Sequence, residues 1–256
     1  MAIYKVTDKK TIAPLFENWD EICIWSCLQD CMGIAYADDL KDPKSAQIFL
    51  GGFCYLAGEA NNELLQNKPD GYQSKSLNLV PQHQQWEEAI EYIFGQKATR
   101  CIRYATKKEA GVFDEQHLQK IVSQLSPEYE LKLIDEELYE KTKKCTWSQY
   151  TCGNYSCYED YQKNGIGIAV LKNNEIVSAA SSYAFYRDGI EIEIDTRKDE
   201  RGQGLASICG AQLILECLKR NLYPSWDALS KTSLFIAQKL GYTFAREYIS
   251  YEIVDF

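Results

Sequence analysis

Histidine is scarce in this sequence of 256 residues, which contains only His83 and His117. A histidine-based metal centre or a catalytic triad therefore has little material here. Long apolar runs are missing too, because no stretch approaches the ~18 apolar residues of a membrane-spanning helix. The first residues, MAIYKVTDKK, lack the basic start and the apolar core of a signal peptide. We therefore expect a cytoplasmic location.

The ten cysteines do not point to a metal site either. In a chain of this length without an export signal, we expect reduced cysteines that are buried as small apolar residues. Cys23, Cys27 and Cys31 are spaced by four and share one helical face, but this spacing matches none of the usual zinc patterns. Cys152 and Cys157, in the segment CGNYSC, match none either. We expect no metal.

Charge is distributed unevenly along the chain. Residues 1–140 hold 14 basic and 23 acidic residues, whereas residues 141–256 hold 14 of each, so the net charge of −9 comes from the first part. An acidic chain lacks the basic surface that nucleic-acid phosphates require. The excess favours a cationic partner or serves solubility. We expect neither a nucleic-acid partner nor a membrane.

The chain shows no internal repeat and no proline-rich linker, but its composition changes near Glu140, where a charged segment gives way to a polar, aromatic one. We expect an N-terminal α/β domain over residues 1–140, whose function the sequence leaves unclear, and a second domain over residues 141–256. In the first part, strand and helix patterns alternate. Helices are predicted over 11–30, 84–95 and 113–127, and strands within 45–60, 76–82 and 98–108.

The second part has sharper patterns. Residues 164–196 contain three strands joined by the turns Asn173-Asn174 and Arg187-Asp188-Gly189, which predicts an antiparallel meander. The pattern then predicts a helix over 204–220, a short strand over 225–228, a helix over 231–242 and a last strand over 243–254. The third strand of the meander alternates strictly. It places Ile190, Ile192 and Ile194 on one face and Glu191, Glu193 and Asp195 on the other.

Two glycines stand between the meander and the long helix, in RKDERGQGLASICG. The start of a helix leaves backbone N–H groups without partners and carries the positive end of the helix dipole, so it favours a phosphate. Gly202 and Gly204 would allow close approach, and Arg201 would add positive charge. The alternative is an ordinary tight turn with solvated charges.

The hexapeptide RGQGLA fits the Arg/Gln-x-x-Gly-x-Gly/Ala signature and resembles the GCN5-related N-acetyltransferase (GNAT) family. A dinucleotide-binding fold would require a third glycine and a parallel βαβ unit. The order of elements from about Trp147 to Val254 is similar to the family's. The stretch from Gly189 to Tyr242 looks most like the subgroup that includes the zwittermicin A resistance acetyltransferase. The fold class is then mixed α/β, with a GNAT fold in the C-terminal half.

The resemblance implies acetyl-CoA as the acyl donor, without a metal. It also implies that the sheet splays between the strand Ile190–Thr196 and the strand near Trp226, with the thioester in the gap. The implied donor-binding residues are Ile194, Asp195 and Thr196 beside the pantetheine, Arg201, Gly202, Gln203, Gly204, Leu205, Ala206 and Ser207 on the pyrophosphate, and Ser233.

Amide formation from a thioester requires a base for the attacking amine and tolerates a weak acid for the departing thiolate. Glu193 is the first choice for the base and Glu191 the second, because both lie on the strand beside the donor; an acidic strand facing solvent is the alternative. The family's common asparagine and tyrosine are replaced here by Ser230 and Ala237. Tyr242, Ser233 or another tyrosine is then the acid, unless the thiolate leaves without one.

The acidic first part favours a small cationic acceptor with a primary amine, such as an amino-polyol, an amino sugar or a polyamine, and a role in antibiotic resistance. A CoA-binding sensor with little turnover is the alternative, since the changes at Ser230 and Ala237 permit it. In a third hypothesis, the N-terminal part carries the function and is a degenerate copy of the same fold. We expect a monomer or a homodimer.

Overall fold

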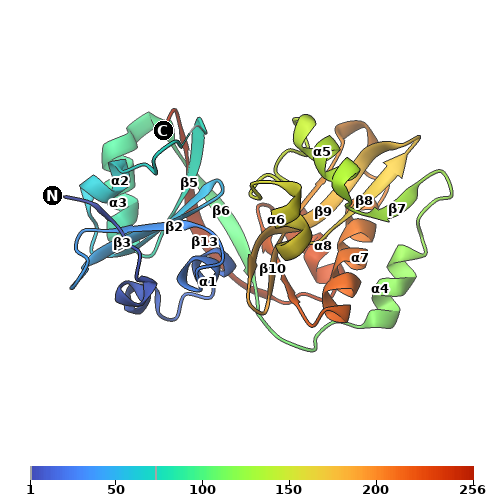
Figure 1. The fold of residues 1–256 in the computed structure, drawn as a ribbon, viewed down its shortest axis with the longest axis horizontal. Helices are drawn as coiled ribbons and strands as arrows, with labels where there is room; N and C mark the ends of the chain where they lie inside the picture. The colour runs from blue at the N-terminus through green and yellow to red at the C-terminus, as the bar shows by residue number, and fades with distance from the viewer. Residues whose placement is uncertain (1, 73) are drawn as a thin grey trace. The chain divides into compact units, whose positions relative to one another are not determined.

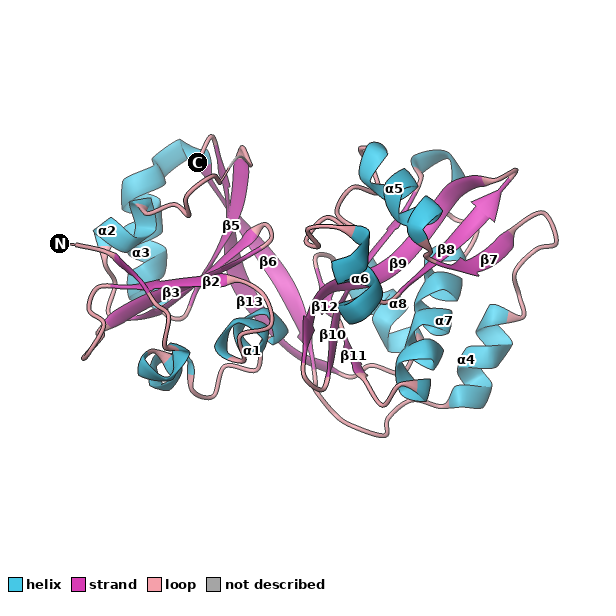
Figure 2. Cartoon of the chain, in the orientation of Figure 1, coloured by secondary structure: helices cyan, strands magenta, loops and turns pink. Residues whose placement is uncertain are grey.

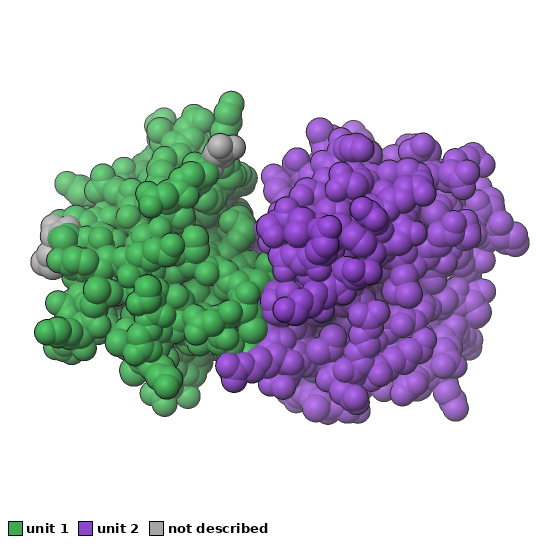
Figure 3. All heavy atoms as spheres, in the orientation of Figure 1, with its two compact units in different colours: residues 1–103, 247–256 green, residues 104–246 purple. Residues whose placement is uncertain are grey.

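The computed structural model describes residues 2–72 and 74–256. The chain forms two compact units (Figure 3). Unit 1 comprises residues 1–103 and 247–256, and unit 2 comprises residues 104–246. The strands β6 (Ala98–Thr106) and β13 (Phe244–Val254) each contain residues of both units. Unit 1 is therefore built from both ends of the sequence, and each unit is described separately below.

Unit 1 is a twisted sheet with short helices (Figure 1). Its strands follow the order β1-β2-β3-β4-β5-β13-β6, and β4 and β5 are parallel. Trp86 and Ile90 of α3 are fully buried against Leu56, Leu79 and Tyr251 of the sheet. The other elements are β1 (Tyr4–Lys5), η1 (Lys9–Thr11), η2 (Ala13–Phe16), α1 (Ile22–Leu28), β2 (Ile34–Ala37), β3 (Ser45–Leu50), β4 (Phe53–Gly58), α2 (Asn62–Gln66), β5 (Ser76–Pro81), α3 (Gln84–Phe94) and η3 (Gly95–Lys97).

Unit 2 is a five-stranded sheet of order β11-β10-β9-β8-β7 with helices on both faces (Figure 2). Its strands are antiparallel except for β10 and β11. Leu118 of α4 and Ile208 of α7 join one core with Ile190, while Tyr139 and Tyr161 of α5 and α6 join another. The elements are α4 (Glu115–Val122), β7 (Glu130–Leu133), α5 (Glu136–Lys144), α6 (Tyr158–Asn164), β8 (Gly167–Lys172), β9 (Glu175–Tyr186), β10 (Gly189–Thr196), η4 (Lys198–Glu200), α7 (Leu205–Lys219), β11 (Tyr223–Ser225), β12 (Asp227–Ala228) and α8 (Lys231–Lys239).

The predicted meander is confirmed, because β8, β9 and β10 pair antiparallel. Asn173 and Asn174 have φ angles of +51° and +65°, the left-handed backbone that a tight hairpin requires. The alternation of β10 is confirmed as well. Ile190, Ile192 and Ile194 join the core beneath α7, and the acidic residues take the opposite face.

Other predictions were wrong in detail. The helix predicted over 11–30 is divided into η1, η2 and α1. Asn18, with a φ of +61°, interrupts the helical backbone between η2 and α1. The strand predicted over 225–228 is two strands, since Ser225 pairs with β10 and Asp227 with β6.

The composition change near Glu140 does not mark a division between the compact units. Residues 104–140 belong to unit 2, where Leu118 and Ile121 of α4 pack into the core with α7. Within the described residues, no helix is both long enough and apolar enough to cross a lipid bilayer.

Candidate functional site

The glycine loop links the end of β10 to the start of α7. Gly202 and Gly204 have φ angles of +83° and +77°, in the left-handed region that favours glycine. A Cβ placed on either glycine would meet no heavy atom of the protein within 4 Å. The backbone conformation therefore calls for glycine at both positions, while the space beside them is open to a ligand.

The first turn of α7 offers its backbone amides without a protein cap. Gly204 is the N-cap residue and has no side chain to accept a hydrogen bond, and no acidic residue occupies the first turn. The helix continues for 15 residues. Its N-terminus therefore combines uncapped N–H groups with the positive end of a helix dipole, an arrangement that favours an anion.

Arg201 is held beside this loop by the end of β10. Its Nε donates to the Thr196 carbonyl at 2.9 Å, and its Nη2 lies 3.2 Å from Asp195 Oδ1. The side chain stays 61% exposed. Asp195 offsets part of this positive charge, so Arg201 would attract an anion less strongly than an arginine without an acidic neighbour.

Glu200, the residue before Arg201, is held in place by three side chains. Its carboxylate accepts a hydrogen bond from the Tyr129 hydroxyl at 2.7 Å and pairs with Lys172 Nζ at 3.1 Å and Arg197 Nη2 at 3.6 Å. The hydrogen bond from Tyr129, followed by that from Lys172, lowers the pKa of Glu200. No local pattern in the sequence indicates this cluster, because its members come from separate elements.

The sheet of unit 2 forks beside the loop. β10 pairs with β11 only over Gly189–Glu191, whereas its pairing with β9 continues to Thr196. After Ser225 the chain leaves β10, and Asp227 pairs with Ala105 of β6. The outer edge of β10 beyond Glu191 is therefore not paired with β11, at the place where the family resemblance implies a splay.

Glu191 occupies the fork and is 5% exposed. Its Oε1 accepts a hydrogen bond from the Asp227 amide at 2.7 Å, and its Oε2 has no hydrogen-bond partner among the described residues. Burial raises the pKa of Glu191, the positive charge of Lys108 opposes this rise, and the negative charge of Asp227 adds to it. A buried carboxylate with one oxygen unengaged and a raised pKa is suited to receive a proton.

Glu193 shares the face of Glu191 but lies two residues closer to the glycine loop, opposite Ser181 of β9. It is only partly buried. The two glutamates are thus brought to one face, as predicted, and the burial and the fork position favour Glu191 over the first choice, Glu193.

The position of Tyr242 does not suit an acid for the departing thiol. The side chain is 4% exposed, and its hydroxyl donates to the Pro224 carbonyl at 2.5 Å. Burial raises the pKa of Tyr242 well above its usual range. Its ring packs against Phe113 and Trp226. The hydroxyl thus ties the end of α8 to β11, which corrects the catalytic role predicted for it.

The serines of α8 have local partners. Ser230 caps the helix by accepting from the Ser233 amide at 3.2 Å, and Ser233 Oγ accepts from Trp226 Nε1 at 3.0 Å. Ala237 is fully buried. The two positions where the family commonly has an asparagine and a tyrosine therefore serve helix capping and packing here.

The cysteines form no metal cluster in the part of the chain that the structure describes, where no three metal-ligating side chains gather. Cys23 and Cys27 lie buried in α1, and burial raises the pKa of Cys27 to about 12. Cys152 is buried and Cys157 is exposed, and none of the ten cysteines takes part in a disulfide bond.

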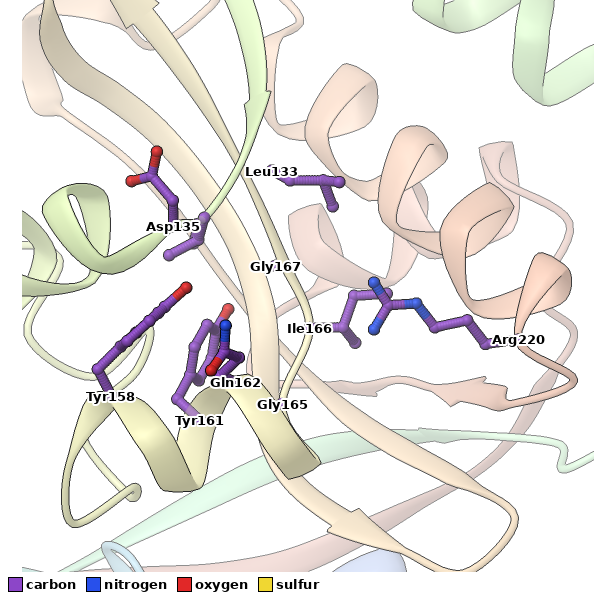
Figure 4. A pocket seen from close by; sticks show the side chains of 10 residues that line it. Leu133, Asp135, Tyr158, Tyr161, Gln162, Gly165, Ile166, Gly167 and Arg220 are labelled. Atoms are coloured by element: carbon purple, nitrogen blue, oxygen red, sulfur yellow. The ribbon is translucent and has the colours of Figure 1, made fainter.

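A pocket of about 260 Å³ lies elsewhere in unit 2, at the end of β7 and the start of β8 (Figure 4). Asp135 at its rim caps α5 by accepting from the Leu138 amide at 3.0 Å. None of the loop or fork residues lines this pocket, so the candidate site lies outside it. The lining residues are Leu133, Ile134, Asp135, Tyr158, Tyr161, Gln162, Gly165, Ile166, Gly167 and Arg220.

Comparison with known proteins adds an independent line of support. The profile of the family described as GNAT acetyltransferase matches residues 13–251, which include parts of both units. The chain is 29% identical over 274 residues to the uncharacterized N-acetyltransferase YdfB of Bacillus subtilis (strain 168). That match covers 98% of this chain and 99% of the relative.

Solved structures agree with this match. A GCN5-related N-acetyltransferase-like protein from Streptococcus suis 89/1591 is 45% identical, with a TM-score of 0.91, over 96% of this chain and 98% of that one. A tandem GNAT protein from the clavulanic acid biosynthesis pathway has a TM-score of 0.51 at 8% identity, over 100% of this chain and 99% of that one. This second likeness shows a common fold alone.

Proposed function

The chain belongs to the GNAT acetyltransferase family, and we propose that it transfers the acetyl group of acetyl-CoA to a primary amine of a small cationic molecule. Use of acetyl-CoA is general in the family. The observation that carries the proposal here is the glycine loop, whose two glycines adopt left-handed φ angles beside open space at an uncapped helix N-terminus. Such a site fits a diphosphate.

The residues present fit acetyl-CoA at this place. The backbone from Arg201 to Ser207 would hold the diphosphate, and the unpaired edge of β10 at Ile194–Thr196 would lie beside the pantetheine. The first turn of α8, with Ser233, is the remaining predicted contact. Acetyl-CoA supplies an acyl thioester when bound. The fork between β10 and β11 would admit it without the breaking of any strand pairing.

Glu191 is the base in this proposal. Its Oε2 would hold the proton taken from the amine, and the hydrogen bond from the Asp227 amide to Oε1 fixes the orientation of the carboxylate. The raised pKa brings Glu191 closer to the pKa of an amine, which makes proton transfer easier. Glu193 remains the second candidate, and CoA leaves as a thiolate without a dedicated acid because thiols are acidic enough.

The acceptor class follows from the charge at the fork. Glu191, Glu193 and Asp195 share one face of β10, and Asp227 lies near Glu191. Clustered carboxylates attract cations, so we propose an amino-polyol, an amino sugar or a polyamine as the acceptor. The likeness of residues 189–242 to the subgroup of the zwittermicin A resistance acetyltransferase supports a role in antibiotic resistance.

The division into two compact units suggests a role for each part of the chain. We propose that the donor-binding domain predicted over 141–256 also requires residues 104–140, because α4 packs into its core. The tandem GNAT protein supports, at the level of the fold, the proposal that the N-terminal part is a degenerate copy. We propose that the protein acts in the cytoplasm as a monomer or a homodimer, without a metal.

A CoA-binding sensor is the second candidate. The observation that favours it is the capping role of Ser230 and the burial of Ala237, which remove the family's common polar pair. Release of free thiol from acetyl-CoA, measured with a panel of cationic amines, separates the two functions. Turnover supports the enzyme, whereas tight binding without thiol release supports the sensor.

Substitution of the proposed base sharpens this test. Glu191→Gln keeps the size of the side chain and removes its ability to take a proton, so we expect kcat to fall by about 10²- to 10⁴-fold while the KM for acetyl-CoA stays the same. Glu193→Gln is the matched variant on the same face. A larger loss of kcat in Glu193→Gln than in Glu191→Gln would reassign the base to Glu193.

A further inference from the structure

Trp226 is the residue at which the chain crosses from β11 to β12 at the fork. Ser225 is the last residue of β11 and pairs with β10, whereas Asp227 is the first residue of β12 and pairs with β6. Trp226 lies between them and belongs to neither strand. It is 2% exposed, so its backbone carbonyl needs a partner within the protein.

Side chains supply the partners for the backbone at this crossing. The Thr106 hydroxyl donates to the Trp226 carbonyl at 2.6 Å, and this bond is buried. The Asp227 amide donates to Glu191 Oε1 at 2.7 Å. If β11 continued beside β10, backbone groups of β10 would form such bonds instead. Two side chains therefore replace the strand ladder at the point where it ends.

Thr106 is placed at the crossing by the pairing of β6 with β12. Ala105 is the register partner of Asp227, so Thr106 stands opposite Trp226 one step further along the two chains. Thr106 is 2% exposed, and like Trp226 it belongs to unit 2. The register thus brings the Thr106 hydroxyl to the Trp226 carbonyl, although 120 positions separate the two residues.

The indole ring of Trp226 is held in place as well. Its Nε1 donates to Ser233 Oγ at 3.0 Å, and its ring centroid lies 5.7 Å from that of Tyr242. A Cβ placed on Gly210 would lie 3.3 Å from a carbon of the ring. The ring cannot turn without repacking of these neighbours. Side chain and backbone together therefore keep Trp226, and with it the fork, in one position.

The outer edge of β10 beyond Glu191 lies open as a result. Among the described residues, no strand pairs with Ile192–Thr196 on that side. An unpaired strand edge offers backbone N–H and C=O groups to an extended ligand. The pantetheine arm of CoA carries amide groups that can form such bonds, so an open fork favours binding of the donor.

We propose that Thr106 is a positioning residue for the acyl donor, whose hydroxyl holds the Trp226 carbonyl away from β10 and so keeps the fork open for the pantetheine arm. The inference rests on the proposed function and adds to it a residue that acts through the backbone of Trp226, without contact with the reacting atoms. If the hydroxyl is removed, the buried carbonyl loses its partner and can regain one by pairing with an N–H group on the open edge of β10. That pairing would close the fork.

The test compares the affinity of Thr106→Val and Thr142→Val for CoA, measured by calorimetry on the full-length chain. Valine has nearly the shape of threonine but no donor, so we expect Thr106→Val to raise the Kd for CoA about tenfold. Thr106→Ser keeps the hydroxyl and should restore most of the affinity. Thr142 is the matched control, because it is 0% exposed and its hydroxyl donates to the Tyr139 carbonyl at 2.7 Å in α5. Thr142→Val should leave the Kd unchanged.

A shortened ligand separates a role in the fork from general damage to the fold. ADP carries a diphosphate without pantetheine, so Thr106→Val should bind ADP as wild type does while it binds CoA more weakly. An equal loss of affinity for both ligands would overturn the inference. So would an unchanged Kd for CoA in Thr106→Val, or an equal loss of CoA affinity in Thr142→Val. Thr106→Ala, which also lacks the hydroxyl, is the second variant if Thr106→Val does not fold.

Amide hydrogen exchange along β10 makes the test independent of ligand binding. In wild type without CoA, the amides of Ile192–Thr196 that do not pair with β9 should exchange rapidly, because the edge is open. In Thr106→Val they should exchange more slowly, because the fork closes. If wild type binds neither CoA nor ADP, the proposed function is wrong, and the exchange rates alone then decide whether Thr106 holds the fork open. Unchanged exchange in Thr106→Val would show that it does not.

Discussion

Gly204→Asp is the most informative single change in the glycine loop. The residue has a φ of +77°, and a left-handed conformation costs a residue with a Cβ about 1–2 kcal/mol. Aspartate tolerates this region better than most residues, and a carboxylate at a helix N-terminus regains about 0.3–1 kcal/mol from the helix dipole. We therefore expect the free energy of unfolding to fall by no more than about 2 kcal/mol.

The same carboxylate would lie where the diphosphate binds, since no protein atom lies within 4 Å of a Cβ placed on Gly204. Two negative charges about 4 Å apart repel by about 4 kcal/mol at an effective dielectric constant of about 20. This energy corresponds to a loss of affinity of about 1,000-fold. Isothermal titration calorimetry with CoA measures the loss, and chemical denaturation measures the stability of the same samples.

Gly111→Asp is the matched control. Gly111 has a φ of +74° and, like Gly204, nothing within 4 Å of an added Cβ. It lies in the loop before α4, so the variant pays a similar backbone cost without placing a charge at the start of α7. We expect it to bind CoA like the wild type. If Gly204→Asp also kept wild-type affinity, the loop would not be the diphosphate site and the assignment would fail.

Two further changes test the residues around the site. Glu200→Gln should weaken CoA binding, measured by calorimetry, because Glu200 anchors the loop through Tyr129 and Lys172. The kcat at saturating acetyl-CoA should stay unchanged. An unchanged dissociation constant for CoA would contradict this expectation. Because the pKa of Glu200 is lowered in the folded state, its contribution to stability is present above the pKa of an unfolded glutamate and is lost as the pH falls through the folded value. Denaturation midpoints measured across acidic pH should therefore fall less steeply in Glu200→Gln than in wild type. Tyr242→Phe leaves the Pro224 carbonyl without its donor and should lower the free energy of unfolding by about 1–3 kcal/mol with kcat retained; a large loss of kcat in a stable variant would restore Tyr242 as a catalytic residue.

Local patterns in the sequence were sufficient to predict the glycine loop and the antiparallel meander. Left-handed φ angles at Gly202, Gly204, Asn173 and Asn174 depend on the residue type itself, and the alternation of β10 depends on its own period. These features can be read from a few consecutive residues. For the same reason, the face that carries both glutamates was predicted correctly.

The fork and its chemistry could not be read in this way. The choice between Glu191 and Glu193 depends on where β11 stops pairing with β10, and that register brings Ser225 opposite Glu191 from 34 positions away in the numbering. The anchor of Glu200 involves Tyr129, which is 71 positions away. Such contacts follow from tertiary packing, for which a single sequence carries no local pattern.

The boundary between the two units could not be predicted from the sequence for a related reason. Composition changes near Glu140, yet β6 and β13 each run through both units. Within one continuous strand, no turn or linker marks where one compact unit ends and the other begins. The division therefore depends on which elements pack together, as α4 does with α7, and composition does not record this.

The central claim is that the backbone at the head of α7 binds a diphosphate. A crystal structure of the full-length chain with bound CoA tests it most directly. We predict that the diphosphate oxygens accept hydrogen bonds from backbone amides between Arg201 and Ser207, with the pantetheine beside Ile194–Thr196. A loop filled by the protein's own side chains, or a diphosphate bound at another place, would contradict the claim.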